Sequence, residues 1–143
     1  HLGNTPQGPL EPPYRPAVNP LAPLLLFAVF IGGGLGSVSR YLFGVWLNGK
    51  TLLPWGTLLA NIAATALLAW AVTRCAEKWP DHLAMQAGLA IGFCGGFSTF
   101  STFSADTHRL MAQGQWAWAL ANVTISVIGC IAVFAIISGY LRR

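Results

Sequence analysis

The sequence predicts an all-α membrane protein with four membrane-spanning helices. Three observations predict it. Of the 143 residues, 55% are hydrophobic and only 8% are charged, whereas soluble globular chains carry about 25% charged residues. A soluble domain of this composition would expose large apolar patches and aggregate. Finally, four long apolar stretches follow one another along the chain, separated by short polar segments.

The first 20 residues form a separate region. Residues 1–20 contain six prolines and show no apolar periodicity, which predicts a disordered, polyproline-like tail. This region lacks the basic segment, apolar core and small-residue cleavage site of a signal peptide. The membrane domain is therefore expected over residues 21–143.

The four apolar stretches have the length of membrane spans, since a helix needs about 20 residues to cross the hydrocarbon core. The predicted spans, in chain order, are residues 21–47, 53–72, 83–103 and 116–141. Tryptophans lie near the ends of these spans, as in an interfacial aromatic belt: Trp46, Trp55, Trp79, Trp116 and Trp118. The short polar connections leave no room for a soluble domain.

The positive charge is small and scattered. The net charge is +4, and nucleic-acid binding would need Lys and Arg clustered on one face or arm, so no nucleic-acid partner is expected. With four spans, both termini and the middle loop share one side of the membrane. That side would carry Arg15, Arg74, Lys78, Arg142 and Arg143, and the other side Arg40, Lys50 and Arg109. This weak bias is expected to permit insertion in both orientations.

Acidic and catalytic side chains are nearly missing from the predicted spans. Glu11, Glu77, Asp81 and Asp106 all lie outside the span centres, whereas a proton-coupled transporter normally needs a titrating group in the membrane. The sequence shows no Ser/His/Asp or paired-carboxylate arrangement, so enzyme chemistry is not expected. The three cysteines form no CxxC or Cys/His cluster, which argues against a zinc-type site or a disulfide framework.

Neutral polar residues recur at helical spacing in two spans. They are Thr57, Asn61 and Thr65 in the second span, and Asn122, Ser126 and Cys130 in the fourth. Residues four apart share one face of a helix. Such residues usually hydrogen-bond between helices, at about 0.6 kcal/mol on average, and spacing alone favours that interpretation. The other interpretation is a polar track through a narrow, uncharged pore, whose donors would suit an anion.

The third span holds the most specific feature. Two adjacent glycines, Gly95 and Gly96, precede four hydroxyl residues within 98–102. Adjacent glycines weaken a helix, and Ser and Thr offer the backbone competing hydrogen bonds. A helix broken in mid-membrane is therefore predicted, and such backbone survives only when it is buried in protein or lines a water-filled cavity. Close helix packing through Gly92 and Gly96 is the alternative, although packing alone leaves the polar run unexplained.

These residues also carry a family resemblance. The run GGFSTFSTF at 95–103 is similar to the signature of the Fluc fluoride channels, also called CrcB. GGGLGSVSRY at 32–41 and GTLLAN at 56–61 extend the resemblance, and 122–130 fits the polar positions of the fourth span. It covers the chain from about residue 24 to its end. Three ordered motifs in a four-span chain of this size are specific together.

The resemblance implies a fold and a function. Members are small four-span subunits that form antiparallel, dual-topology homodimers in the inner (plasma) membrane. Two pores run along the dimer, and a structural sodium ion is held at its centre. The channel exports toxic fluoride passively, so the expected partners are a second copy of the chain, fluoride and membrane lipid.

The resemblance also implies site residues by motif position. Gly95 and Ser98 would hold the sodium ion through backbone carbonyls; Ser98 stands where the family usually has Thr, which a carbonyl ligand tolerates. The fluoride-pore residues, with their polar neighbours as further candidates and Arg40 near the wide entrance, are Asn61, Phe100, Phe103, Ser126, Thr57, Thr102, Asn122, Cys130 and Arg40. Amide and hydroxyl groups are donors, and a phenylalanine edge is positive, so both suit an anion.

Two other classes remain as alternatives. A small multidrug transporter is also a four-span, dual-topology dimer, but it should carry a glutamate in its first span, and this chain has none there. A non-conducting membrane scaffold or assembly subunit would not need the polar run of the third span.

Overall fold

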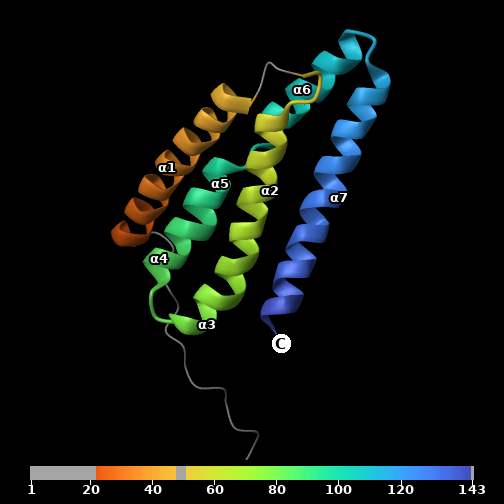
Figure 1. Cartoon of the computed structure of the whole chain (residues 1–143). Helices are drawn as coiled ribbons and strands as arrows, with labels where there is room; N and C mark the ends of the chain where they lie inside the picture. Colours follow the sequence, from red (N-terminus) through yellow and green to blue (C-terminus); the bar gives the residue numbers. More distant parts are fainter. Residues whose placement is uncertain (1–21, 48–50, 143) are drawn as a thin grey trace, which may run out of the picture.

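The structure is a computed structural model that describes residues 22–47 and 51–142. The predicted tail at 1–20, the loop at 48–50 and Arg143 lie outside the described residues. Within them every regular element is a helix. Four helices are long and apolar enough to cross a membrane: Pro23–Leu47, Trp55–Lys78, Leu83–Ala112 and Trp116–Leu141. The prediction of an all-helical, four-span protein is thus confirmed (Figure 1).

The second span is longer than predicted. It begins as α2 (Trp55–Trp70), widens into a π-helical turn, η1 (Ala71–Cys75), and ends in α3 (Ala76–Lys78). The prediction ended at residue 72 because Arg74 and Glu77 break the apolar run. In the folded chain these two side chains lie on one helix face and pair at 3.8 Å. Residues three apart on a helix are neighbours, so the polar turn stays helical.

The third span consists of two halves. The first runs through α4 (Leu83–Ala87), η2 (Gly88–Phe93) and α5 (Cys94–Phe97), and the second is α6 (Phe100–Ala112). Between them the backbone is extended, with ψ 157° at Ser98 and φ −154°, ψ 118° at Thr99. The Thr99 side chain accepts the N–H of Thr102 at 3.1 Å and caps α6, as a helix N-cap does.

The two halves of the third span have different neighbours. The first half packs along α1 (Pro23–Leu47), whereas α6 packs against α7 (Trp116–Leu141). Helix α2 lies between these two regions and contacts α1, α5 and α7 (Figure 1). The change of neighbour occurs at the extended residues, so the interruption lets one span contribute to both sides of the bundle.

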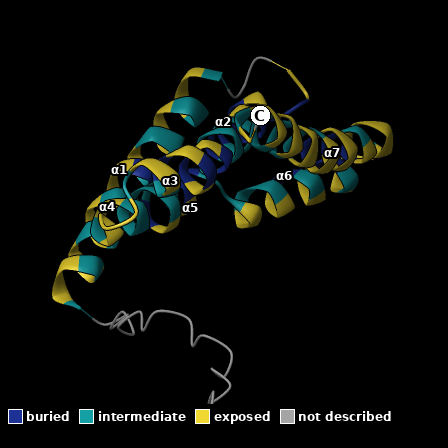
Figure 2. Ribbon diagram, turned by 90° about the horizontal axis from the view of Figure 1, so that it is seen from below, coloured by how far each residue is buried: buried dark blue, intermediate teal, exposed yellow. Residues whose placement is uncertain are grey.

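Burial is concentrated in α2 and at the interruption. Ala60, Ala64 and Phe97 form a small core, whereas Gly36 is the only buried residue in α1. Large apolar side chains are exposed along α1 and α7, including Phe30 and Ile136, and much of both ribbons is coloured as exposed in Figure 2. An apolar outer surface of this kind needs a lipid or protein environment, in agreement with a multi-pass membrane protein.

Candidate functional site

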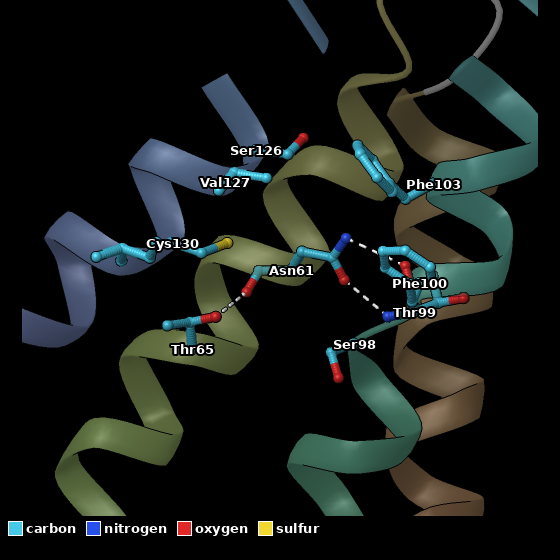
Figure 3. Close-up of a pocket in the computed structure, with 10 residues that line it drawn as sticks. Asn61, Thr65, Ser98, Thr99, Phe100, Phe103, Ser126, Val127 and Cys130 are labelled. Carbon is cyan, nitrogen blue, oxygen red and sulfur yellow. Dashed lines mark hydrogen bonds between the residues drawn. The ribbon is translucent and has the colours of Figure 1, made fainter. Parts of the chain in front are cut away.

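A groove with a mostly apolar wall and several polar side chains lies between α2, α6 and α7, beside the interruption of the third span (Figure 3). Its volume is about 340 Å³. It is lined by Asn61, Thr65, Ser98, Thr99, Phe100, Phe103, Ser126, Val127, Cys130 and Ile131. None of these lining residues carries a charge. Six of the eleven residues predicted as sites, from three different spans, therefore meet at one place.

Asn61 on α2 makes two hydrogen bonds with the backbone of Thr99. Its Oδ1 accepts the Thr99 N–H at 2.7 Å, and its Nδ2 donates to the Thr99 carbonyl at 3.3 Å (Figure 3). An amide nitrogen carries two hydrogens, so one N–H of Asn61 remains for the groove. The Asn61 amide therefore both shapes the interruption and offers a donor to a ligand.

The backbone around the interruption is hydrogen-bonded by side chains from both sides. Arg40 Nε on α1 donates to the Gly96 carbonyl at 3.1 Å, while Asn61 holds Thr99 from α2. A continuous helix would pair the Gly95 carbonyl with the Thr99 N–H and the Ser98 carbonyl with the Thr102 N–H. Asn61 and the Thr99 hydroxyl take those two donors instead. The carbonyls of Gly95 and Ser98 are the pair that the resemblance assigns to sodium, and their chemistry fits a cation.

The two predicted pore phenylalanines lie together. The ring centroids of Phe100 and Phe103 are 5.6 Å apart at an interplanar angle of 42°. Both belong to α6, and both line the groove. Phe100 is 80% exposed within the single chain. Its ring is therefore not needed to fill this subunit's own core.

The predicted residues of α7 divide into two kinds. Ser126 and Cys130 line the groove, and Ser126 Oγ is a buried side-chain oxygen that finds no hydrogen-bond partner within residues 22–47 and 51–142. Asn122, one turn earlier, is only 1% exposed and donates to Thr107 Oγ1 at 2.9 Å. Asn122 therefore links α7 to α6, whereas the Ser126 hydroxyl has no partner among the described residues.

Three further predicted residues meet in a second recess. Arg40, Thr57 and Thr102 line a hollow of about 280 Å³ together with Tyr41, Gly44 and Val45. The Thr57 hydroxyl donates to Asp106 Oδ2 at 2.8 Å, so its proton serves this acid. Gly95 lies elsewhere, on an exposed face beside Ser98. The structure thus separates Arg40, Thr57, Thr102, Asn122 and Gly95 from the groove.

Sequence reasoning missed two residues that organise the site. Asp106 is only 7% exposed and accepts hydrogen bonds from Thr57 and, at 3.0 Å, from Arg109. These bonds compensate the buried charge, so α6 continues beyond residue 103, where the prediction ended. Thr99 caps α6 with its hydroxyl, and its backbone N–H donates to Asn61 Oδ1. The Asp106–Arg109 spacing of three residues was a readable signal. No local sequence signal could have indicated the Thr99–Asn61 contact, because it joins distant parts of the chain.

Comparisons with known proteins place the chain in a family. The sequence model of the family described as "CrcB-like protein, Camphor Resistance (CrcB)" matches residues 27–140. A protein of Bordetella petrii named "Fluoride-specific ion channel FluC" is 43% identical over 118 residues, which is 81% of this chain and 90% of the relative.

Two further relatives carry the same name. One, from Nitrobacter winogradskyi, is 42% identical and covers 80% of this chain and 90% of its own length. Another, from Escherichia coli, is 38% identical and covers 78% of this chain and 89% of its own length. With a family model matching most of its length and relatives of this identity, the chain belongs to the CrcB family.

Proposed function

We propose that this chain is a subunit of a fluoride-selective ion channel that exports fluoride passively across the membrane. The observation that carries the proposal is the groove between α2, α6 and α7: it collects hydrogen-bond donors and two phenylalanine rings, and none of the described residues that line it is charged. The relatives' printed name, "Fluoride-specific ion channel FluC", supports the same ion. The CrcB family consists of ion channels rather than enzymes.

The groove suits a small, strongly hydrated anion. The buried Ser126 hydroxyl and the remaining N–H of Asn61 can replace water around fluoride. The edges of Phe100 and Phe103 are the positive parts of their rings, so they can face the anion without binding it permanently. Conduction requires sites that bind an ion and also release it, which a fixed positive charge in the groove would oppose.

A single chain supplies only part of a pore wall, and we propose that a second copy completes it. Phe100 is 80% exposed on the single chain, so its ring is available to a partner. The assembly is an antiparallel homodimer with two pores, surrounded by lipid. The small charge bias between the two sides of the spans supports insertion in both orientations. In a bacterium the membrane is the inner membrane.

A structural sodium ion at the centre of the dimer is part of the proposal. Gly95 and Ser98 of each subunit would hold it through carbonyl oxygens, in mid-membrane, where the third span is interrupted. When bound, the cation supplies positive charge to carbonyls that lack their helical donors. Oxygen ligands suit a hard cation. The described residues contain no cluster of His, Cys, Asp or Glu that could hold a metal, so the proposed ligands are backbone oxygens.

Reconstituted protein tests the function directly. Purified protein in liposomes loaded with potassium fluoride should release fluoride when valinomycin balances the charge, and liposomes loaded with potassium chloride should not release chloride. Exchange of protons for organic cations would identify a small multidrug transporter instead. Absence of both activities in correctly folded protein would identify a non-conducting scaffold.

Gly95→Leu tests the dimer. A Cβ at Gly95 meets no atom of the described residues within 4 Å, so this substitution should leave the subunit folded and disturb only what lies outside it. We expect loss of fluoride release together with a shift from dimer to monomer, measured by cross-linking in the membrane. Unchanged release and unchanged cross-linking would exclude a subunit contact at Gly95.

A further inference from the structure

The interruption of the third span redistributes two backbone donors. In a continuous helix the N–H of Thr99 would bond the Gly95 carbonyl, and the N–H of Thr102 would bond the Ser98 carbonyl. In the folded chain the Thr99 N–H donates to Asn61 Oδ1 at 2.7 Å, and the Thr102 N–H donates to Thr99 Oγ1 at 3.1 Å. The donors for both carbonyls are therefore captured by side chains.

The neighbouring carbonyls are treated differently. The Gly96 carbonyl accepts Arg40 Nε at 3.1 Å, and the Thr99 carbonyl accepts Asn61 Nδ2 at 3.3 Å. Backbone oxygens at membrane depth need partners because no bulk water reaches them. Side chains of α1 and α2 thus satisfy two carbonyls of the interruption, while Gly95 and Ser98 are deprived of their helical donors.

We propose that Asn61 is a positioning residue for a monovalent cation held by the Gly95 and Ser98 carbonyls. By capturing the Thr99 N–H, its amide oxygen prevents that donor from closing on the Gly95 carbonyl. This inference rests on one part of the function proposed above, the bound cation. Since Asn61 also lines the groove (Figure 3), one side chain joins the path of the anion to the site of the cation.

The residue type at position 61 matches this role. The Thr99 backbone presents an N–H and a carbonyl, and only a primary amide offers an acceptor and a donor side by side. Asn61 stands on α2 between Ala60 and Ala64, which belong to the buried core. The amide is therefore anchored on the best-packed helix, and a substitution there should change the geometry of Thr99 rather than be absorbed by movement of α2.

A sodium titration of the purified full-length protein tests the inference. The thermal unfolding midpoint is measured against sodium chloride, with N-methylglucamine chloride keeping ionic strength constant and no fluoride present. Asn61→Leu has neither acceptor nor donor, and it should raise the sodium concentration for half-maximal stabilisation about tenfold. Asn61→Asp keeps an acceptor for the Thr99 N–H, so its requirement should remain at or below that of the wild type.

Two controls separate this role from others. Ser126→Ala alters the same groove without touching the interruption, and its sodium response should equal that of the wild type. A purely structural Asn61 would lower the midpoint by the same amount at every sodium concentration. An Asn61 that serves only as a fluoride donor would leave the sodium response of Asn61→Leu unchanged. Either result overturns the inference.

Two further arrangements keep the test decisive. Should Asn61→Leu fail to fold, Asn61→Gln replaces it, because it displaces the amide by one methylene and should also raise the sodium requirement. An unchanged sodium requirement in Asn61→Gln overturns the inference.

Fluoride release from liposomes is measured in parallel. A wild-type protein that releases fluoride but ignores sodium removes the cation and this inference while the channel stands. An Asn61-dependent sodium response without fluoride release removes the channel and supports the inference.

Discussion

The two halves of the third span solve opposite packing problems. The first half meets α1 backbone to backbone: a Cβ at Gly36 would overlap the Phe93 carbonyl, and one at Gly96 would overlap the Gly33 carbonyl. The second half, α6, packs against α7 but leaves a groove between itself, α2 and α7. Small residues allow close approach, whereas the bulky Phe100 and Phe103 line the groove. One span thus combines a closely packed half with a half that borders the groove.

The largest expected effect on stability comes from adding a methyl group to the close contact between α1 and the first half of the third span. Gly36→Ala should destabilise the protein by about 3 kcal/mol, since overpacking forces backbone to move. Gly34→Ala is the matched control, because a Cβ there meets no described atom within 4 Å, and alanine favours a helix by up to about 1 kcal/mol. Equilibrium unfolding in detergent micelles measures both. Equal stabilities would show that the α1 contact tolerates a methyl group.

On the hollow side, the phenylalanine rings should matter for flux rather than for folding. Phe100→Ile and Phe103→Ile should each lower fluoride flux by about tenfold or more, equivalent to about 1.4 kcal/mol. Isoleucine keeps the apolar bulk and loses the ring quadrupole. Fluoride release from liposomes is compared at equal amounts of folded dimer. Wild-type flux in both variants would remove the rings from the mechanism.

Two residues one turn apart on α7 sharpen the contrast between support and site. Asn122→Ala removes the bond to Thr107 and should cost about 1–2 kcal/mol of stability. Ser126→Ala removes a hydroxyl without a partner in the described chain, so stability should stay near wild type while fluoride flux falls. Unfolding and flux are measured on the same preparations. A large loss of stability in Ser126→Ala would make Ser126 a packing residue.

The smallest effect is expected at the interruption itself. Ser98→Ala should leave fluoride flux and the sodium response close to wild type, because the proposed ligand is the backbone carbonyl and alanine retains it. The extended backbone at this position, with φ −75° and ψ 157°, is open to any L-residue. A strong loss of flux in Ser98→Ala would show that the hydroxyl, which also lines the groove, contacts the anion.

Much of the architecture followed from local pattern. Apolar length predicted four spans, and the fourth was predicted with the bounds that the structure has, Trp116–Leu141. The spans ended too early where charges interrupted the apolar run, at residues 72 and 103. In those turns, ion pairs and the Thr57–Asp106 bond compensate the charges. Composition shows that a charge is present, but only neighbours in space show whether it is paired.

The site residues divide in the same way. The sequence by itself determined which groups are available: an amide, hydroxyls, two phenylalanines and adjacent glycines, because residue type and helical spacing place them on particular faces. Only the tertiary structure decided their partners. It joined Asn61 to Thr99, Arg40 to Gly96 and Asn122 to Thr107, and it left Ser126 without a partner among the described residues. These outcomes depend on which helices meet, and a hydrogen bond between distant segments leaves no local pattern by which to foresee it.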